Sequence, residues 1–325
     1  MVRVCRSAIA MAGILRAPIM HMSFELQRRK HIERELSKKA RQELRTTAEA
    51  LTVTGADEFE NAVHESRKRL KKVRAVVALL EEAGAKVPKK DRKRLKSAAA
   101  ALSRIRDSAA IIETFDRLRR HYPKQLPNHT YKILRHGLVS ARDRAQARAQ
   151  RQGEMARTAE RLTTVRKSAR DWPSSRLDDS DLFAVIANSY RRSRTAMTRA
   201  RQSGHSATVH DWRKQVKTFW YQMRLAKALT VGVAPLIADF KRLETELGDD
   251  HNLVVLEATL RGCNDLRSMR PAMRHVGRLA ERMRQQLRRR AFTLGRRLYV
   301  REPKAFERWT RRSRNRAIAS HAVAA

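Results

Sequence analysis

Two segments of the chain carry the same basic pattern, each led by a histidine. Residues 63–74 read VHESRKRLKKVR, and residues 209–220 read VHDWRKQVKTFW. In both, an arginine follows the histidine by three positions and a lysine follows it by seven, and His210 lies 146 positions after His64 (210 − 64). On an α-helix, residues three, four and seven apart share a face. Each segment is therefore predicted to project a histidine and a row of cations from one side of a helix.

These residue types suit phosphate recognition. Arginine presents a planar fork of donors that grips phosphate oxygens in pairs, and lysine supplies a mobile point charge. A neighbouring phosphate favours the charged form of histidine, whereas surrounding cations without an anion lower the histidine pKa. We therefore expect anion binding to take up protons, and affinity to rise as the pH falls toward about 6.5, the ordinary histidine value.

Each predicted basic face contains further polar groups and adjoins an apolar stripe at helical spacing. The candidate site residues on the two faces are His64, Arg67, Lys68, Lys71 and Arg74 in the first segment, and His210, Arg213, Lys214, Lys217, Tyr221 and Arg224 in the second. A solvated surface is the competing interpretation, because some cation pattern recurs by chance in a chain so rich in arginine and lysine. Recurrence of the pattern in both halves favours a shared site for a large polyanion.

The charge of the chain restricts its partners. Its 325 residues include 73 Lys and Arg against 33 Asp and Glu, a net charge of +40 at pH 7. Self-repulsion on this scale destabilises a compact state unless an anion relieves it. Nucleic acid, an anionic membrane surface and an inorganic polyanion are the candidate partners. The hydrophobic share of 42% is ample for a buried core.

The sequence predicts a cytoplasmic protein without a membrane span. No apolar run approaches the roughly 18–20 residues that a span needs. The only cysteines, Cys5 and Cys263, favour a reducing interior. We expect residues 1–23 to be a flexible extension rather than a signal peptide, because the apolar stretch from Ala8 to Leu15 is near the lower length limit for one.

Helical periodicity runs almost throughout, and glycine and proline are scarce, so the predicted fold class is all-α. The polar segment 171–181, with Pro173, is the best loop and divides two sets of four predicted helices. Short connections favour antiparallel bundles. The expected units are the extension 1–23, a first four-helix half at 24–172, a second at 173–300, and a basic, frayed or loosely docked tail at 301–325. One continuous helix is expected from about 128 to 170.

The chain resembles the CHAD family, the conserved histidine α-helical domain. VHESRKRLKKVR and VHDWRKQVKTFWYQMR are similar to the family's two histidine helices, and RIRDSAAII at 104–112 and LGDDHNLVVL at 247–256 to its two later helices. The resemblance covers roughly residues 24–299. It implies two four-helix bundles related by an internal pseudo-twofold duplication, a central basic cleft, binding of inorganic polyphosphate, and association with polyphosphate granules. It also adds Arg106 and Lys241 as candidate site residues.

Other activities find little support in the sequence. The chain has no GxxxxGK[ST] phosphate loop, no GxGxxG fingerprint and no ExExK strand motif. The run Asp249–His251 is interpreted as a cap or turn rather than a metal site, and the acidic residues of 178–181 as a loop and helix N-cap. No catalytic residue, metal site or cofactor is predicted, and the protein is expected not to be an enzyme.

Two alternatives stay open, non-specific nucleic-acid binding and polyphosphate hydrolysis. The net charge permits incidental nucleic-acid binding at low salt. An aromatic content of 5% argues against an array of base-stacking platforms. A phosphohydrolase needs acidic metal ligands facing the cleft, and the sequence identifies none. The sequence predicts no particular oligomeric state.

Overall fold

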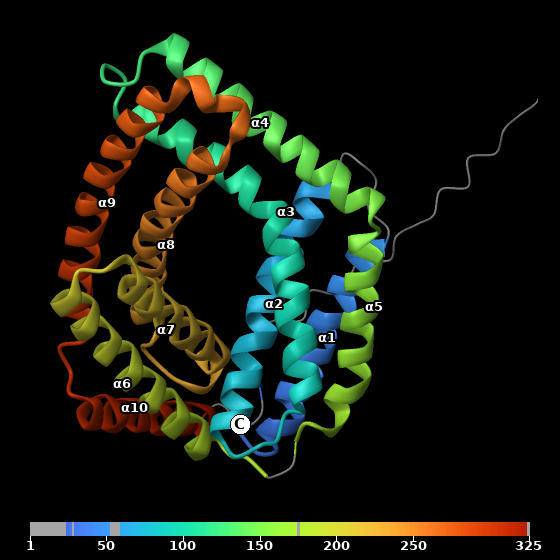
Figure 1. Cartoon of the computed structure of the whole chain (residues 1–325). Coiled ribbons are helices and arrows are strands. Elements are labelled where there is room, and N and C mark those ends of the chain that lie inside the picture. The colour runs from blue at the N-terminus through green and yellow to red at the C-terminus, as the bar shows by residue number, and fades with distance from the viewer. Residues whose placement is uncertain (1–23, 28, 53–58, 174–175, 324–325) are drawn as a thin grey trace, which may run out of the picture.

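The computed structural model describes residues 24–27, 29–52, 59–173 and 176–323, and this part of the chain is all-α, without a strand (Figure 1). Short 3₁₀ turns join some of its helices. The helices are α1 Ile32–Thr52, α2 Phe59–Glu82, α3 Lys89–His121, α4 Asn128–Arg151, α5 Glu154–Ser168, α6 Asp179–Ser203, α7 Ser206–Leu225, α8 Ala234–Gly262, α9 Arg270–Leu298 and α10 Pro303–Val323.

Prolines and an aspartate mark several helix starts, and the N-cap predicted at 178–181 is confirmed. Pro235 and Pro271 stand in the first turns of α8 and α9, where a missing backbone N–H costs nothing. The Asp178 carboxylate accepts the backbone N–H groups of Ser180 and Asp181, at 2.7 and 3.1 Å, and so caps α6. The Asp181 carboxylate accepts the Asp178 N–H at 3.1 Å in return, which completes a capping box.

The prediction of one continuous helix at 128–170 is wrong. The chain breaks it into α4 and α5 at Gln152 and Gly153. Gly153 has a φ of 58°, in the left-handed region that glycine adopts without strain. A single glycine inside a polar helical pattern gives little warning of such a break. The helical periodicity on both sides of Gly153 therefore predicted one continuous helix.

The expectation of a frayed or loosely docked tail is also wrong. Residues from Pro303 form α10, which packs against α6. Phe306 is buried, and its ring stacks on that of Tyr190 with centroids 3.9 Å apart and an angle of 4° between the planes. α10 also carries apolar residues that pack against the rest of the protein. The prediction considered only the basic charge of this segment and overlooked them.

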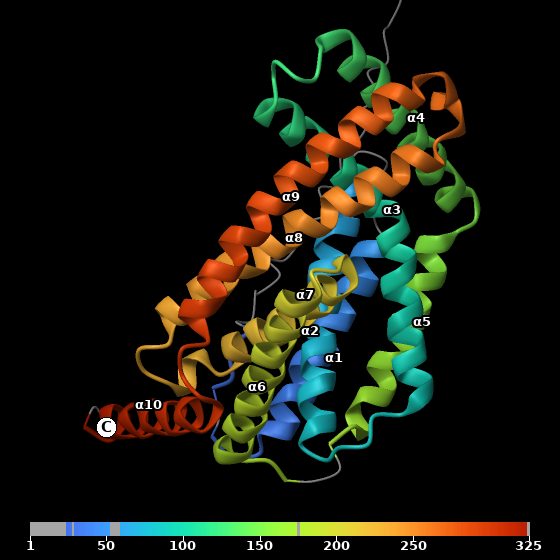
Figure 2. The same ribbon diagram turned by 60° about the vertical axis from the view of Figure 1, so that its left-hand side comes forward.

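The helices are arranged in a ring in the view of Figure 1, and Figure 2 shows the same arrangement turned by 60°. α2 packs against α7, and α3 packs against α8. α8 begins 145 positions after α3 (234 − 89), an offset close to the 146 positions that separate His64 from His210. The repeated segments therefore face one another across the middle of the molecule.

The apolar core is not divided at the loop between the two halves. The larger cluster joins buried residues of both, such as Leu44 of α1, Leu70 of α2 and Phe219 of α7. A smaller cluster joins α3 and α4 to α8 and α9, and it includes the fully buried Phe115 and Leu256. The prediction of two four-helix bundles is therefore not confirmed, because both clusters contain residues from the two halves.

No helix in the described ranges is both long and apolar enough to cross a bilayer. Cys263 is a free, half-buried thiol, and Cys5 lies outside the described residues.

Candidate anion-binding pocket

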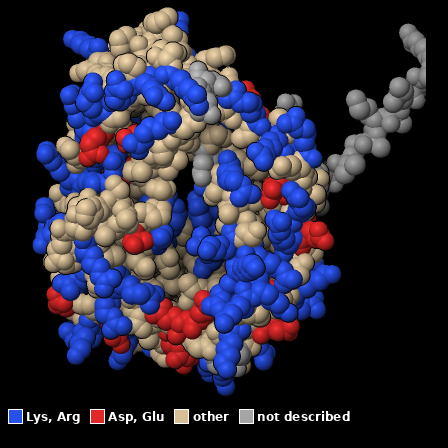
Figure 3. All heavy atoms as spheres, viewed as in Figure 1, with Lys and Arg blue, Asp and Glu red and all other residues tan. Residues whose placement is uncertain are grey.

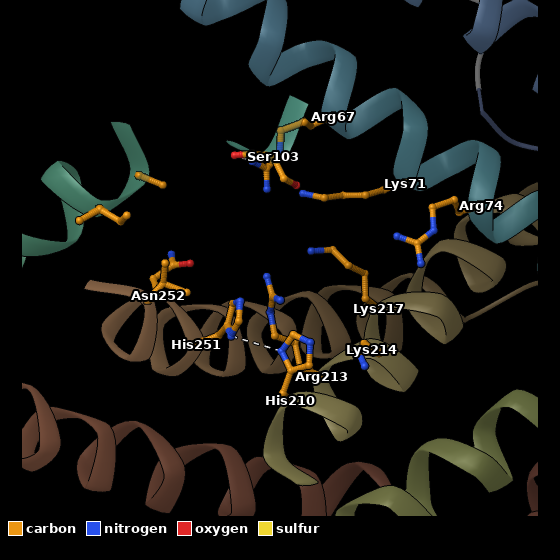
Figure 4. Close-up of a pocket in the computed structure, with 13 residues that line it drawn as sticks. Arg67, Lys71, Arg74, Ser103, His210, Arg213, Lys214, Lys217, His251 and Asn252 are labelled. Carbon is orange, nitrogen blue, oxygen red and sulfur yellow. Dashed lines mark hydrogen bonds between the residues drawn. The ribbon is translucent and has the colours of Figure 1, made fainter. Parts of the chain in front are cut away.

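A pocket of about 300 Å³ lies among α2, α3, α7 and α8. Figure 3 shows this face of the molecule hollowed near its centre, with lysine and arginine side chains around the hollow. Figure 4 shows the pocket from within, with side chains of α2 and α7 entering from opposite walls. Its lining consists of Arg67, Lys71, Arg74, Ser103, Ala110, Ile111, His210, Arg213, Lys214, Lys217, His251, Asn252 and Val255.

The α2 wall follows directly from the helical spacing of its cations. Val63, Leu70 and Val73 are buried in the core, so the adjacent stripe of α2 faces the pocket. Arg67 and Lys71 lie one turn apart on that stripe and enter the pocket. The Arg67 guanidinium also donates from Nη1 to the carbonyl oxygen of Ser103 at 3.2 Å, which ties α2 to α3.

The α7 wall repeats this arrangement. Val209, Trp212 and Val216 are buried, and the neighbouring stripe presents His210, Arg213, Lys214 and Lys217 to the pocket. The structure thus brings together seven residues predicted from the two segments, three on α2 and four on α7.

One carboxylate neutralises much of the α7 side. The Lys217 ammonium lies 2.6 Å from Oε1 of Glu244 on α8, and Lys241 lies 2.7 Å from its Oε2. Burial alone acts to raise the pKa of Glu244, but the two ammonium groups overcome it and lower this pKa to about 2. Glu244 is therefore ionised at neutral pH. Glu244 is not among the site residues predicted from the sequence.

Lys71 has no such partner. In the described part of the chain, no carboxylate lies within ion-pair distance of its ammonium group. Burial, with the positive charges of Lys217 and Arg67 next, lowers the pKa of Lys71 to about 7, although Glu244 opposes this. Protonation of Lys71 is consequently costly in the pocket without a bound anion.

Two histidine rings meet at the α8 edge of the pocket. Nδ1 of His210 and Nδ1 of His251 are 3.2 Å apart, and the ring centroids are 4.5 Å apart. Burial and then the charge of Arg213 lower the pKa of His251 to about 3, and burial with Lys214 lowers the pKa of His210. Both rings are neutral at pH 7 without a ligand, so one ring nitrogen donates to the other.

His251 is a pocket residue that the sequence analysis missed. Its neighbour Asp249 pairs with Arg117, and Asp250 pairs with Arg288 at 2.8 Å. Asp249, Asp250 and His251 all lie within α8. The interpretation of this run as a cap or turn is therefore wrong. Within the described residues, no group of three or more histidine, cysteine or acidic side chains is placed to hold a metal ion.

The model of the CHAD domain family matches residues 35–261, which is well over half of the chain. The protein belongs to the CHAD family. The family predicted from the histidine helices is confirmed. A crystal structure of the CHAD domain from the plant Ricinus communis superposes with a TM-score of 0.62 at 17% sequence identity, over 89% of this chain and 98% of that chain. This likeness shows that the two share a fold. None of the curated proteins matches the chain significantly.

Several predicted site residues of this CHAD protein lie away from the pocket lining. Tyr221 is buried, edge-on to the ring of Phe24, and the Arg224 guanidinium lies over both rings and over Trp220. Lys241 lies over the Trp220 ring, 5.0 Å from its centroid. Aromatic packing at the end of α7 thus holds these polar groups outside the pocket lining, which the spacing of the cations did not reveal.

The remaining predicted residues are placed as follows. Lys68 is exposed and pairs with Glu65 at 2.7 Å. His64 is half-buried on α2 but is not among the pocket-lining residues. The side chain of Arg106 lies outside the described residues. Arg106 and His251 stand at corresponding positions of the two aligned segments (251 − 145), and this correspondence is the signal that could have identified His251.

Proposed function

We propose that this protein binds inorganic polyphosphate, without processing it, in the pocket among α2, α3, α7 and α8. The CHAD family is linked with polyphosphate binding in general. The observation that carries the proposal is the composition of the lining, which has six lysine and arginine side chains and, among the described residues, no carboxylate. Such a surface attracts anions and repels cations.

The arrangement of the cations favours a linear polyanion. Arg67, Lys71 and Arg74 succeed one another along α2, and Arg213 and Lys217 do so along α7. One turn of helix advances about 5.4 Å, so each wall carries a row of charges rather than one focus. A chain of phosphates that runs between the walls meets arginine forks and lysine charges along its length.

The lining also favours inorganic phosphate over nucleic acid. Apart from the two histidines, its described residues offer no aromatic ring on which a base would stack. Nucleic acid is then expected to bind only through its backbone charge, and to weaken steeply as salt increases.

Competition binding at physiological salt tests the proposal. Long-chain polyphosphate is titrated against single-stranded DNA and RNA at equal phosphate concentration, and released phosphate is measured with magnesium present. We expect polyphosphate to displace nucleic acid without release of phosphate. Equal competition would favour general nucleic-acid binding, and magnesium-dependent release would favour a phosphohydrolase.

The site within the protein is tested by a matched pair of variants. Arg67→Glu with Arg213→Glu reverses two charges in the pocket. Arg289→Glu with Arg312→Glu makes the same change of net charge at two exposed positions outside it. Only the first pair is expected to abolish tight polyphosphate binding, and equal losses in both would overturn the proposed site.

The proposed location is the cytoplasm, on polyphosphate granules. A fluorescent fusion of the full chain should then gather at granules in cells that accumulate polyphosphate. The same fusion carrying Arg67→Glu and Arg213→Glu should spread evenly. Granule association that survives both substitutions would show that the pocket is not what brings the protein there.

A further inference from the structure

Lys71 differs from every other lysine of the pocket in its surroundings. It enters from α2 toward Lys217 of α7, and Figure 4 shows the two ammonium groups pointing into the same space. The charged groups that act on it most strongly come from three of the four helices around the pocket: Arg67 on α2, Arg213 and Lys217 on α7, and Glu244 on α8. The carboxylate of Glu244 is already engaged at both oxygens by Lys217 and Lys241.

This placement makes the Lys71 amine nucleophilic at neutral pH. A partly buried ammonium that faces other cations loses its proton easily, and its pKa falls to about 7. At pH 7 about half of the Lys71 amines are then neutral, whereas an ordinary lysine, with a pKa of about 10.4, is almost entirely protonated. Desolvation and a neighbouring cation are the means by which enzymes activate lysine nucleophiles.

The same pocket concentrates anionic reagents around that amine. Arg67 and Arg213 stand on opposite walls beside Lys71, and each offers several N–H donors to phosphate oxygens. A small molecule that carries both a phosphate group and an electrophilic carbon is therefore held close to a neutral amine. Proximity of this kind accelerates a reaction with no further catalytic group.

We propose that Lys71 is a site of acylation by small acyl phosphates. The amine nitrogen attacks the carbonyl carbon, and a C–N bond forms. The bond between that carbon and the phosphate oxygen breaks, and inorganic phosphate leaves with the electron pair. The nitrogen loses one proton to water. The product is a neutral amide at Lys71, and nothing is oxidised or reduced.

Acylation would regulate the proposed polyphosphate site, and this consequence rests on the proposed function. An amide at Lys71 removes one positive charge from the pocket lining and adds bulk there. Bound polyphosphate, in turn, would favour the protonated form of Lys71 and cover it. Each event is therefore expected to oppose the other.

The test uses acetyl phosphate on the purified full chain, with peptide mass spectrometry to quantify acetylation at each lysine. Lys68 is the internal comparison, because it is exposed and lies on the same helix. We expect Lys71 to react at least about tenfold faster than Lys68 at pH 7. The Lys71 rate should level off above about pH 8, whereas the Lys68 rate should climb toward pH 10. Equal rates or identical pH profiles would overturn the proposal.

An uncharged acetyl donor, the N-hydroxysuccinimide ester of acetic acid, separates attraction from reactivity. Without a phosphate group it is not drawn to Arg67 and Arg213, so the preference for Lys71 over Lys68 should fall severalfold. An undiminished preference would contradict the role of phosphate recognition in the acylation.

Lys71→Arg retains the positive charge and removes the amine. Pretreatment with acetyl phosphate should lower the polyphosphate affinity of the natural protein and leave that of Lys71→Arg unchanged. The two proposals fail in different ways. Selective acetylation of Lys71 that polyphosphate does not prevent would contradict the proposed function alone. Tight polyphosphate binding without selective acetylation would contradict the inference about Lys71 alone.

Discussion

The basic faces of α2 and α7 have the same spacing and different surroundings. Lys217 on α7 is paired with Glu244, whereas Lys71 on α2 has no carboxylate partner in the described part of the chain. His210 meets His251 in the pocket, whereas His64 is not among its lining residues. Spacing therefore determines which side of a helix faces the pocket, and the neighbouring helix determines the charge that each side chain carries there.

The difference between the two walls traces to one position of the repeat. α3 and α8 are the neighbours of α2 and α7, and their sequences align at an offset of 145 positions. Lys96 then corresponds to Lys241, but Ala99 stands where α8 has Glu244 (244 − 145). Glu244 is a counterion for Lys217 on the α7 wall, whereas no carboxylate among the described residues pairs with Lys71 on the α2 wall. The presence of alanine at position 99 and glutamate at position 244 therefore accounts for the difference in charge between the two pocket walls.

The largest loss of polyphosphate affinity is expected from substitutions at the positions that the two walls share. Arg67 and Arg213 occupy equivalent places and both line the pocket. Reversing both, in Arg67→Glu with Arg213→Glu, should reduce polyphosphate affinity by about a hundredfold or more at physiological salt. Isothermal titration of a polyphosphate of defined length measures this. A loss confined to one of the single variants would show that the walls do not contribute equally.

Removing the counterion should make α7 resemble α2. Glu244→Gln leaves Lys217 buried without its partner, and we expect a loss of about 3 kcal/mol in the free energy of unfolding, measured with urea. The same substitution should strengthen polyphosphate binding, because a negative charge beside the pocket is lost. Unchanged stability would mean that the Glu244 pair contributes little.

The Glu244 pair also has a defined pH dependence. The folded protein holds the pKa of this carboxyl at about 2, below its ordinary value of 4.5. Its contribution to stability is therefore complete above about pH 4.5 and is lost as the pH falls through about 2. The stability difference between the natural protein and Glu244→Gln should shrink over that interval.

Adding a counterion should make α2 resemble α7. Ala99→Glu places a carboxylate at the position equivalent to Glu244, and we expect it to raise the pKa of Lys71 and weaken polyphosphate binding by about 1 kcal/mol. Ala99→Gln has nearly the same shape without the charge and is the control for packing. Equal affinity in the Glu and Gln variants would mean that residue 99 does not act on Lys71.

The pH dependence of binding sharpens this comparison. Bound phosphate favours the protonated form of Lys71, whose pKa in the free protein is about 7. Affinity should therefore be greatest below about pH 7 and fall as the pH rises from 7 toward 10. In Ala99→Glu the fall should begin at a higher pH, and in Lys71→Arg it should be absent.

The smallest effects are expected from the histidines. The pKa of His210 lies below its ordinary value, so the ring is neutral at pH 7, and His210→Ala should change affinity there by less than about twofold. Below about pH 6.5 the natural protein should gain affinity as the ring takes up a proton, and the variant should lack part of that gain. His64→Ala should change the profile less still, because His64 is not a lining residue.

Much of the fold was predictable because its signals are local. Pro235, Pro271 and Asp178 mark helix starts through their own backbone chemistry, and the apolar stripes identify the buried faces. The break at Gly153 was missed because a single glycine in a polar helical pattern gives little warning of it. The docking of Phe306 was missed because its partner Tyr190 lies far away along the chain. The shared cores were missed for the same reason, since periodicity shows that a face is buried and not which helix covers it.

The pocket was predictable in part for related reasons. Helical spacing correctly brought Arg67 and Arg213 toward one space. Spacing also predicted Tyr221 and Arg224 there, but the aromatic side chains near the end of α7 hold both elsewhere. His251 was overlooked because a run of three polar residues resembles a turn when the length of the surrounding helix is unknown.

One apolar core joins Leu44 of α1 to Phe219 of α7, so we expect the two pocket walls to assemble together. Neither wall can open fully without exposing surface that belongs to the other, so the protein should unfold in one cooperative transition. A nick in the backbone between Trp172 and Leu177 should accordingly leave two fragments that stay associated. Fragments produced separately should complement each other when mixed, and neither should be well folded alone.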